Sequence, residues 1–139
     1  MQNLGNRLRA EGGAGVLARM VVDKIQSSPP GKWVIDGIRN PAEIDHLRTL
    51  RPFFLIGVRA LRQTILARMK HRGRDTDIAD TEELEKRLNR EWGEAEPEDG
   101  QQVGRCMHMS DFIVENNHTI NDLKKNVFCI LSNIEESNG

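Results

Sequence analysis

The chain has 139 residues, close to the usual size of a single domain, and it is long enough to bury one hydrophobic core. Its 20 basic and 21 acidic residues nearly cancel, which leaves no overall field to attract nucleic acid or an anionic membrane. No apolar stretch approaches the roughly 20 residues of a membrane-spanning helix, and the two cysteines lie far apart. We therefore expect one soluble domain, residues 1–139, in the reducing cytoplasm, where any anion site is formed locally.

The first quarter of the chain is predicted to be helical and then to form a strand. Apolar residues recur at helical spacing from residue 3 to 27, with an interruption near Gly12 and Gly15. The run Trp33–Val34–Ile35 follows a Ser/Pro/Gly stretch and has no polar alternation. Such a run favours a short strand that is covered on both faces.

Another strand between two helices is expected next. Asn40 and Glu43 have the spacing of a capping box, so a helix should extend over residues 41–50. Residues 53–58 form a second apolar run and predict a strand, and residues 61–71 predict the helix that follows it.

A polar stretch opens the second half of the chain. Residues 72–100 are rich in charged side chains and predict a mobile or inserted segment that contains a helix at 81–92.

The end of the chain returns to alternating elements. We expect a short helix at 101–109, a strand at 111–115 and a closing helix at 119–134, with Thr119 as its N-cap and Asp122 three residues on. Three strands, each followed by a helix, indicate an α/β fold with a three-layer parallel sheet flanked by helices. In such sheets ligands bind at the carboxyl ends of the strands.

Asp36, Gly37 and Arg39 are the first candidate binding residues. They follow the first predicted strand, where the carboxylate would lie at the rim and the glycine would leave room for a ligand. The planar guanidinium of Arg39 could clamp a phosphate. The alternative is a tight strand-to-helix turn with a surface arginine, and the pattern leaves both interpretations open.

A second candidate is the basic stretch that contains Arg68, Arg72 and Arg74. Arg68 and Arg72 are four residues apart, so they project from one face of a helix and could converge on a polyphosphate. The alternative is a solvated helix end whose basic residues offset the helix macrodipole.

Other kinds of site are not supported by the sequence. The glycine-rich residues 11–19 follow no apolar strand, and the chain contains no Gly-Lys-Ser or Gly-Lys-Thr of a phosphate loop. The four histidines and Cys106 form no metal-ligand spacing, so we expect no metal site. No nucleophile elbow is present either.

Several stretches together resemble the P-loop nucleotide kinases related to adenylate kinase, especially the dephospho-coenzyme A kinase-like and deoxynucleoside monophosphate kinase-like branch. They are VIDGIRNPAEIDHLR, ARMKHRGRD and MSDFIVENNHTINDLKKNV, together with the opening LGNRLRAEGGAGVLARMVVDKI. The likeness covers most of the chain. The order and spacing of the stretches carry it, rather than any single motif.

The resemblance implies roles for residues of this chain. Asp36–Arg39 would provide the family's acid and acceptor-binding arginine, with Arg7 and Arg9 beside the acceptor. The segment from 68 to about 90 would be the lid that closes over the phosphates, and Asn116–Asn117 would border the adenine.

The main departure from the family is at the start. The family begins with a strand, a phosphate loop that bears lysine and serine or threonine, and a helix, and this sequence starts after all three. Phosphoryl transfer depends on that loop to hold the phosphates and magnesium. We therefore expect a truncated kinase-like protein that is not catalytic alone and binds a nucleotide or another phosphorylated ligand.

Two alternatives remain open. One is an active nucleoside monophosphate or dephospho-coenzyme A kinase, completed by a partner chain or an upstream segment and using ATP and magnesium. The other is a structural or interaction protein on the same scaffold.

The resemblance also implies a gap in the sheet. In the family the missing strand is central and would lie between the strands predicted at 33–36 and 53–58, so its loss would expose two strand edges. We expect a homodimer or a partner chain to cover them, and no nucleic-acid or membrane partner.

Overall fold

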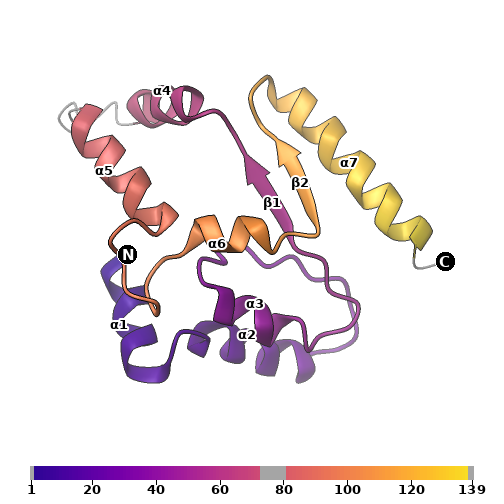
Figure 1. Cartoon of the computed structure of the whole chain (residues 1–139). Helices are drawn as coiled ribbons and strands as arrows, with labels where there is room; N and C mark the ends of the chain where they lie inside the picture. Colours follow the sequence, from indigo (N-terminus) through magenta and orange to yellow (C-terminus); the bar gives the residue numbers. More distant parts are fainter. Residues whose placement is uncertain (1, 73–80, 138–139) are drawn as a thin grey trace. The chain divides into compact units, whose positions relative to one another are not determined.

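The protein is described by a computed structural model that covers residues 2–72 and 81–137 (Figure 1). Its elements in chain order are α1 (Gln2–Gly12), α2 (Val16–Gln26), α3 (Pro41–Leu47), β1 (Ile56–Arg59), α4 (Arg62–Arg72), α5 (Thr81–Trp92), α6 (Val103–His108), β2 (Phe112–Glu115) and α7 (Ile120–Ser137). Over the described residues the fold is therefore α/β and mostly helical.

The elements belong to two compact units. The first unit contains the chain up to Leu55 and the stretch Arg87–Met109, and the second contains Ile56–Lys86 and the chain from Ser110 onward. The boundary crosses α5, so this helix contributes residues to both units.

The first unit is built from α1, α2, α3, α6 and the end of α5. Its N-terminal helices are separated at Gly13, whose φ of 88° lies in the left-handed region that glycine tolerates, as the glycine cluster predicted. The predicted capping box of α3 is present, with Asn40 as N-cap and Glu43 returning the contact. Helix α3 buries Ile44 completely, and Ile44 packs with Cys106 of α6 in a small core.

The predicted first strand is wrong. Residues 31–39 are neither helix nor strand, and the side chains of Trp33 and Val34 are 47% and 97% exposed. A strand is stable only when its backbone groups pair with those of a neighbour, and the sheet in the described part of the chain pairs β1 with β2 alone. The apolar run was a sound signal of β-propensity, but burial depends on a partner strand that the described residues do not supply.

The second unit is built around a parallel pair of strands. β1 pairs with β2 in the register Ile56↔Phe112 to Arg59↔Glu115, so both strands end at the same edge. The predicted third strand is confirmed within one residue, and the predicted strand at 53–58 is shifted to Ile56–Arg59. The three-stranded sheet expected from the sequence is thus a two-stranded sheet over the described residues.

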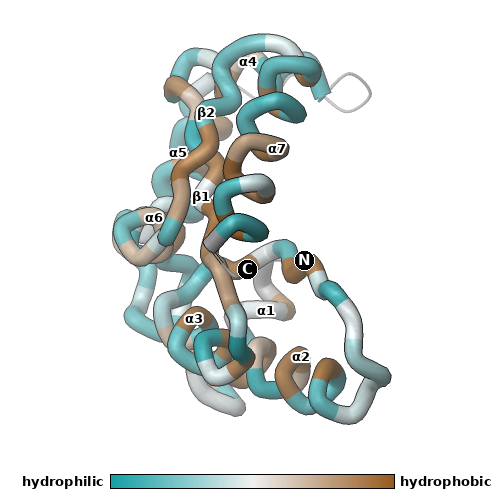
Figure 2. The backbone as a smooth tube through the Cα atoms, turned by 90° about the vertical axis from the view of Figure 1, so that its right-hand side faces the viewer, coloured by the Kyte–Doolittle hydropathy of each residue, from teal (hydrophilic) through white to brown (hydrophobic). Residues whose placement is uncertain are grey.

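Helix α7 packs against β2. Apolar residues recur along α7. Figure 2 colours the hydrophobic positions of α7, β1 and β2 brown. Val114 of β2 is almost fully buried. No helix among the described residues is long and apolar enough to cross a membrane.

Candidate functional site

The turn before α3 is held by a single carboxylate. Oε2 of Glu43 accepts the backbone N–H groups of Arg39 at 2.8 Å and of Asn40 at 3.1 Å. Oε1 of the same carboxylate contacts Arg9 of α1 through Nε at 2.9 Å and Nη2 at 2.7 Å. The side chains of Arg9 and Glu43 are each 4% exposed, so this is a buried ion pair.

Two further contacts fix the same turn from the other side. The amide nitrogen of the Asn40 side chain donates to the carbonyls of Glu98 and Gly100, both at 2.8 Å. The backbone N–H of Gln102 donates to the carbonyl of Arg39 at 2.6 Å. The acidic loop before α6 is therefore attached to the turn by its backbone.

The turn presents Arg39. Its Nη1 donates to the buried Oε1 of Gln101 at 3.1 Å and lies 3.6 Å from Oε1 of Glu91. The side chain of Arg39 is 40% exposed, so it is accessible to solvent in part. Gly37 has a φ of 87°, and a Cβ built at this glycine would have no heavy atom within 4 Å. An arginine side chain that is held by Gln101 and is partly exposed can also bind an oxyanion.

The other predicted residues of this unit have different surroundings. Asp36 is exposed and lies in the irregular segment rather than at the end of a strand. Arg7 is exposed and lies 3.3 Å from Glu11 on the same helix. Arg9 is buried against Glu43, so its guanidinium faces the protein interior.

The remaining predicted residues belong to the second unit. Arg68 of α4 donates to the backbone carbonyls of Asn116 at 2.7 Å and of His118 at 3.1 Å, which ties α4 to the loop after β2. In the same loop the side chain of Asn117 accepts the backbone N–H of Leu61 at 2.6 Å and donates to Glu115 at 3.1 Å.

Arg72 and Arg74 are the last two arginines of the predicted basic stretch. Arg72 is exposed at the end of α4, and Arg74 lies outside the described residues. A single ligand site that includes Arg39 together with Arg68, Arg72 and Arg74 stays a prediction.

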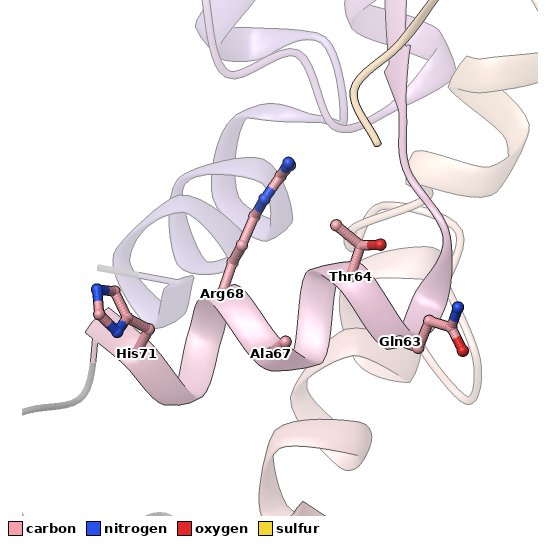
Figure 3. A pocket seen from close by; sticks show the side chains of 5 residues that line it. All are labelled: Gln63, Thr64, Ala67, Arg68 and His71. Atoms are coloured by element: carbon pink, nitrogen blue, oxygen red, sulfur yellow. The ribbon is translucent and has the colours of Figure 1, made fainter. Parts of the chain in front are cut away.

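A hollow of about 500 Å³ lies along α4. It is lined by Gln63, Thr64, Ala67, Arg68 and His71, and Figure 3 shows Thr64, Arg68 and His71 projecting from one side of the helix. All of the lining residues come from one helix. As far as the described residues go, the hollow therefore has none of the convergent groups from several elements that define a small-molecule site.

The metal-binding residue types and the buried thiol have the following surroundings in the described part of the chain. The described residues contain no group of three or more His, Cys, Asp or Glu side chains that could hold a metal ion. Burial, followed by the negative charge of Glu43, raises the pKa of the Cys106 thiol to about 11. A thiol with this pKa is a poor nucleophile at neutral pH.

The sequence predicts Arg39 as a candidate binding residue but gives no sign of the residues that contact it. Glu43 was predicted only as a helix cap, whereas it also binds Arg9, which is 34 positions away in the chain. Gln101 had no local signal, since its contact with Arg39 spans 62 positions. A buried partner at such a separation has no periodic signature in one sequence.

Comparison with known proteins identifies the family. The chain is 32% identical over 134 residues to a UPF0200 protein of Methanosarcina mazei, and the match covers 94% of this chain and 67% of the relative. The chain belongs to the UPF0200 family. A UPF0200 protein of Methanothermobacter thermautotrophicus is 33% identical over 131 residues, covering 94% of this chain and 65% of the relative, and one of Methanocaldococcus jannaschii is 29% identical over 138 residues, covering 96% and 66%.

These UPF0200 relatives are longer than this chain, which spans about two thirds of their length. Their names state no activity. No family model matches the chain.

Proposed function

We propose that this UPF0200 chain binds a nucleotide or another phosphorylated ligand at Arg39 and does not catalyse phosphoryl transfer by itself. The geometry of the Arg39 turn is the observation that carries the proposal, because the Arg39 side chain is held by Gln101 and is 40% exposed, and Gly37, two residues earlier, has open space at its Cβ position. The resemblance to nucleotide kinases supports the class of ligand. The absence of a Gly-Lys-Ser or Gly-Lys-Thr phosphate loop from the sequence supports binding without transfer.

Calorimetric and thermal-shift titration tests this proposal. The panel contains nucleoside monophosphates, ATP with magnesium, and coenzyme A precursors. A ligand that binds the folded chain raises its melting temperature once its concentration exceeds the dissociation constant many-fold. We expect a shift with at least one monophosphate and no turnover with ATP. If no ligand of the panel binds or raises the melting temperature, a structural or interaction protein would be favoured instead.

Substitution of Arg39 tests the site. We expect Arg39→Ala to weaken binding of the monophosphate by about tenfold or more, because it removes a charge-assisted hydrogen bond to the ligand. The affinity of the Arg39→Lys chain should lie between those of the wild type and of Arg39→Ala, since a lysine keeps the charge but not the planar guanidinium. Arg51→Ala removes an exposed arginine outside the turn and serves as the control. An Arg39→Ala chain that binds every monophosphate like the wild type would rule out this site.

An active kinase is the second candidate function. The UPF0200 relatives extend well beyond the matched region, so a phosphate loop and further strands of a three-layer sheet could lie in their remaining third. A full-length relative would then transfer phosphate from ATP and magnesium to a nucleoside monophosphate or to dephospho-coenzyme A. A relative without a Gly-x-x-x-x-Gly-Lys-Ser/Thr sequence and without turnover would exclude this candidate.

Self-association and a cytoplasmic setting complete the proposal. The exposed side chains of Trp33 and Val34, in a segment of strand-like composition, support contact with a second copy or a partner chain. We expect a mass above the 15.8 kDa of one chain by light scattering at micromolar concentration, and a monomer would contradict this. Neither Cys106 nor Cys129 is in a disulfide, which is compatible with a reducing cytoplasm.

A further inference from the structure

We propose that Glu43 and Arg9 are positioning residues for the Arg39 site: the Glu43 carboxylate fixes the backbone of the turn, and Arg9 holds that carboxylate in place. This inference rests on the proposed function, because it explains how the binding arginine is held. It assigns to Arg9 a role different from the direct contact with a ligand that the kinase resemblance implies.

The carboxylate of Glu43 is fully used by its neighbours. An ionised carboxylate can accept about four hydrogen bonds, and here two come from the Arg9 guanidinium and two from successive backbone N–H groups of the turn. Oε1 accepts from the Arg9 guanidinium, and Oε2 accepts from the backbone N–H groups of Arg39 and Asn40. One side chain thus links α1 to the turn.

Arg9 is needed because the carboxylate is buried. A buried charge without a partner is strongly unfavourable, and Arg9 supplies the opposite charge at 2.7 Å inside the protein. Removal of Arg9 would leave the buried Glu43 carboxylate without this opposite charge and would favour its displacement toward solvent. A displaced carboxylate loses its contacts with the backbone N–H groups of the turn.

The consequence for Arg39 is a fixed backbone on both sides of its Cα. Its N–H is held by Glu43 at 2.8 Å, and its carbonyl is held by the N–H of Gln102 at 2.6 Å. The buried Gln101 then orients the guanidinium itself. A side chain that is ordered before binding does not lose further conformational freedom when a phosphate arrives, so affinity benefits.

Variants of Glu43 and Arg9 separate positioning from general stability. Glu43→Leu removes both acceptor oxygens, whereas Glu43→Gln keeps one oxygen for the turn and should rescue it in part. Arg9→Met leaves the carboxylate alone, and the double variant Arg9→Met with Glu43→Gln removes the uncompensated charge. Arg51→Met serves as the matched control, since Arg51 is exposed in the same unit.

Two readouts are measured on the full chain. The first is the affinity for adenosine monophosphate, with inorganic phosphate as a reference, below the unfolding range of each variant. The second is native-state hydrogen exchange of the backbone N–H groups of Arg39 and Asn40, compared with helical N–H groups such as that of Leu47. The second readout needs no ligand.

We expect Glu43→Leu to weaken binding about tenfold and to speed exchange at Arg39 and Asn40 selectively, since a charge-assisted hydrogen bond is lost at each. Glu43→Gln should recover much of both effects, and the double variant should bind better than Arg9→Met. If Glu43→Leu does not fold, the comparison of Glu43→Gln, Arg9→Met and the double variant still decides.

The outcomes distinguish this inference from the proposed function. Wild-type binding that Arg39→Ala abolishes, together with unchanged affinity and exchange in the Glu43 and Arg9 variants, would overturn the positioning role alone. A wild-type chain that binds no phosphate would overturn the proposed function and this role as a part of it, while the exchange data would still show whether Glu43 holds the turn.

Discussion

At Cys106, burial and a neighbouring carboxylate act on the thiol in the same direction. Both disfavour the thiolate and raise the pKa to about 11, and the side chain is 6% exposed in the core beside Ile44. Cys129 on α7 is exposed. The two thiols therefore differ in their access to solvent.

Thiol labelling tests this difference. At slightly alkaline pH we expect a reagent such as iodoacetamide to modify Cys129 and to spare Cys106 in the native chain, because a thiol with a pKa of about 11 carries little thiolate there. Both cysteines should react after denaturation. Mass spectrometry of the labelled peptides reads the result, and equal native rates at the two cysteines would contradict the buried position of Cys106.

At the scale of elements, the helix starts were the most predictable features. Asn40 with Glu43 and Thr119 with Asp122 were both expected at helix starts, and both pairs form reciprocal hydrogen bonds. A cap depends on residues three positions apart, so one sequence contains the whole signal. The strand predicted from Trp33 depended on a distant partner and was wrong for that reason.

The start of α7 gives a pH-dependent prediction. The Thr119 hydroxyl, and then its backbone N–H, hold the pKa of Asp122 below its usual value. A lowered pKa in the folded chain stabilises it above the carboxyl's unfolded pKa, and this stabilisation is lost as the pH falls through the lowered value. We expect Thr119→Ala to destabilise the chain at neutral pH and progressively less in acid.

The measurement for Thr119→Ala combines two methods. Carbon NMR of the Asp122 carboxyl should show its pKa rising toward the usual value, and urea unfolding at several pH values should show the smaller difference in acid. An Asp122 pKa that does not change in the variant would contradict the assignment of the hydroxyl as the main cause.

At the scale of the whole molecule, the two units give an unfolding prediction. The chain has two tryptophans, Trp33 and Trp92, and both belong to the first unit. Among the residues that the structure describes, the second unit contains a sheet of two strands, and such a small sheet is marginally stable by itself. We expect circular dichroism, which reports both units, to begin its urea transition before tryptophan fluorescence does.

Coincident transitions by the two methods would show instead that the chain unfolds as the single domain expected from its length. A variant that affects one unit provides the control. Arg59→Ala removes an ion pair with Glu115 inside the second unit, so it should move the circular dichroism transition and leave the fluorescence transition unchanged.

The sequence by itself determined the features that depend on neighbours along the chain. These are the helices, the capping boxes, the break between α1 and α2, and the presence of Gly37 and Arg39 just before α3. Local periodicity and cap chemistry involve residues a few positions apart, so they are visible in one sequence.

Only the tertiary structure decided which residues surround Arg39 and which apolar run becomes a strand. The contacts of Glu43 with Arg9 and of Gln101 with Arg39 join distant segments, and the pairing of β1 with β2 does so as well. Such contacts form because burial brings charged and polar groups together and requires each to find a partner. The partners are chosen by proximity in the folded chain, so they cannot be read from the order of residues in the sequence.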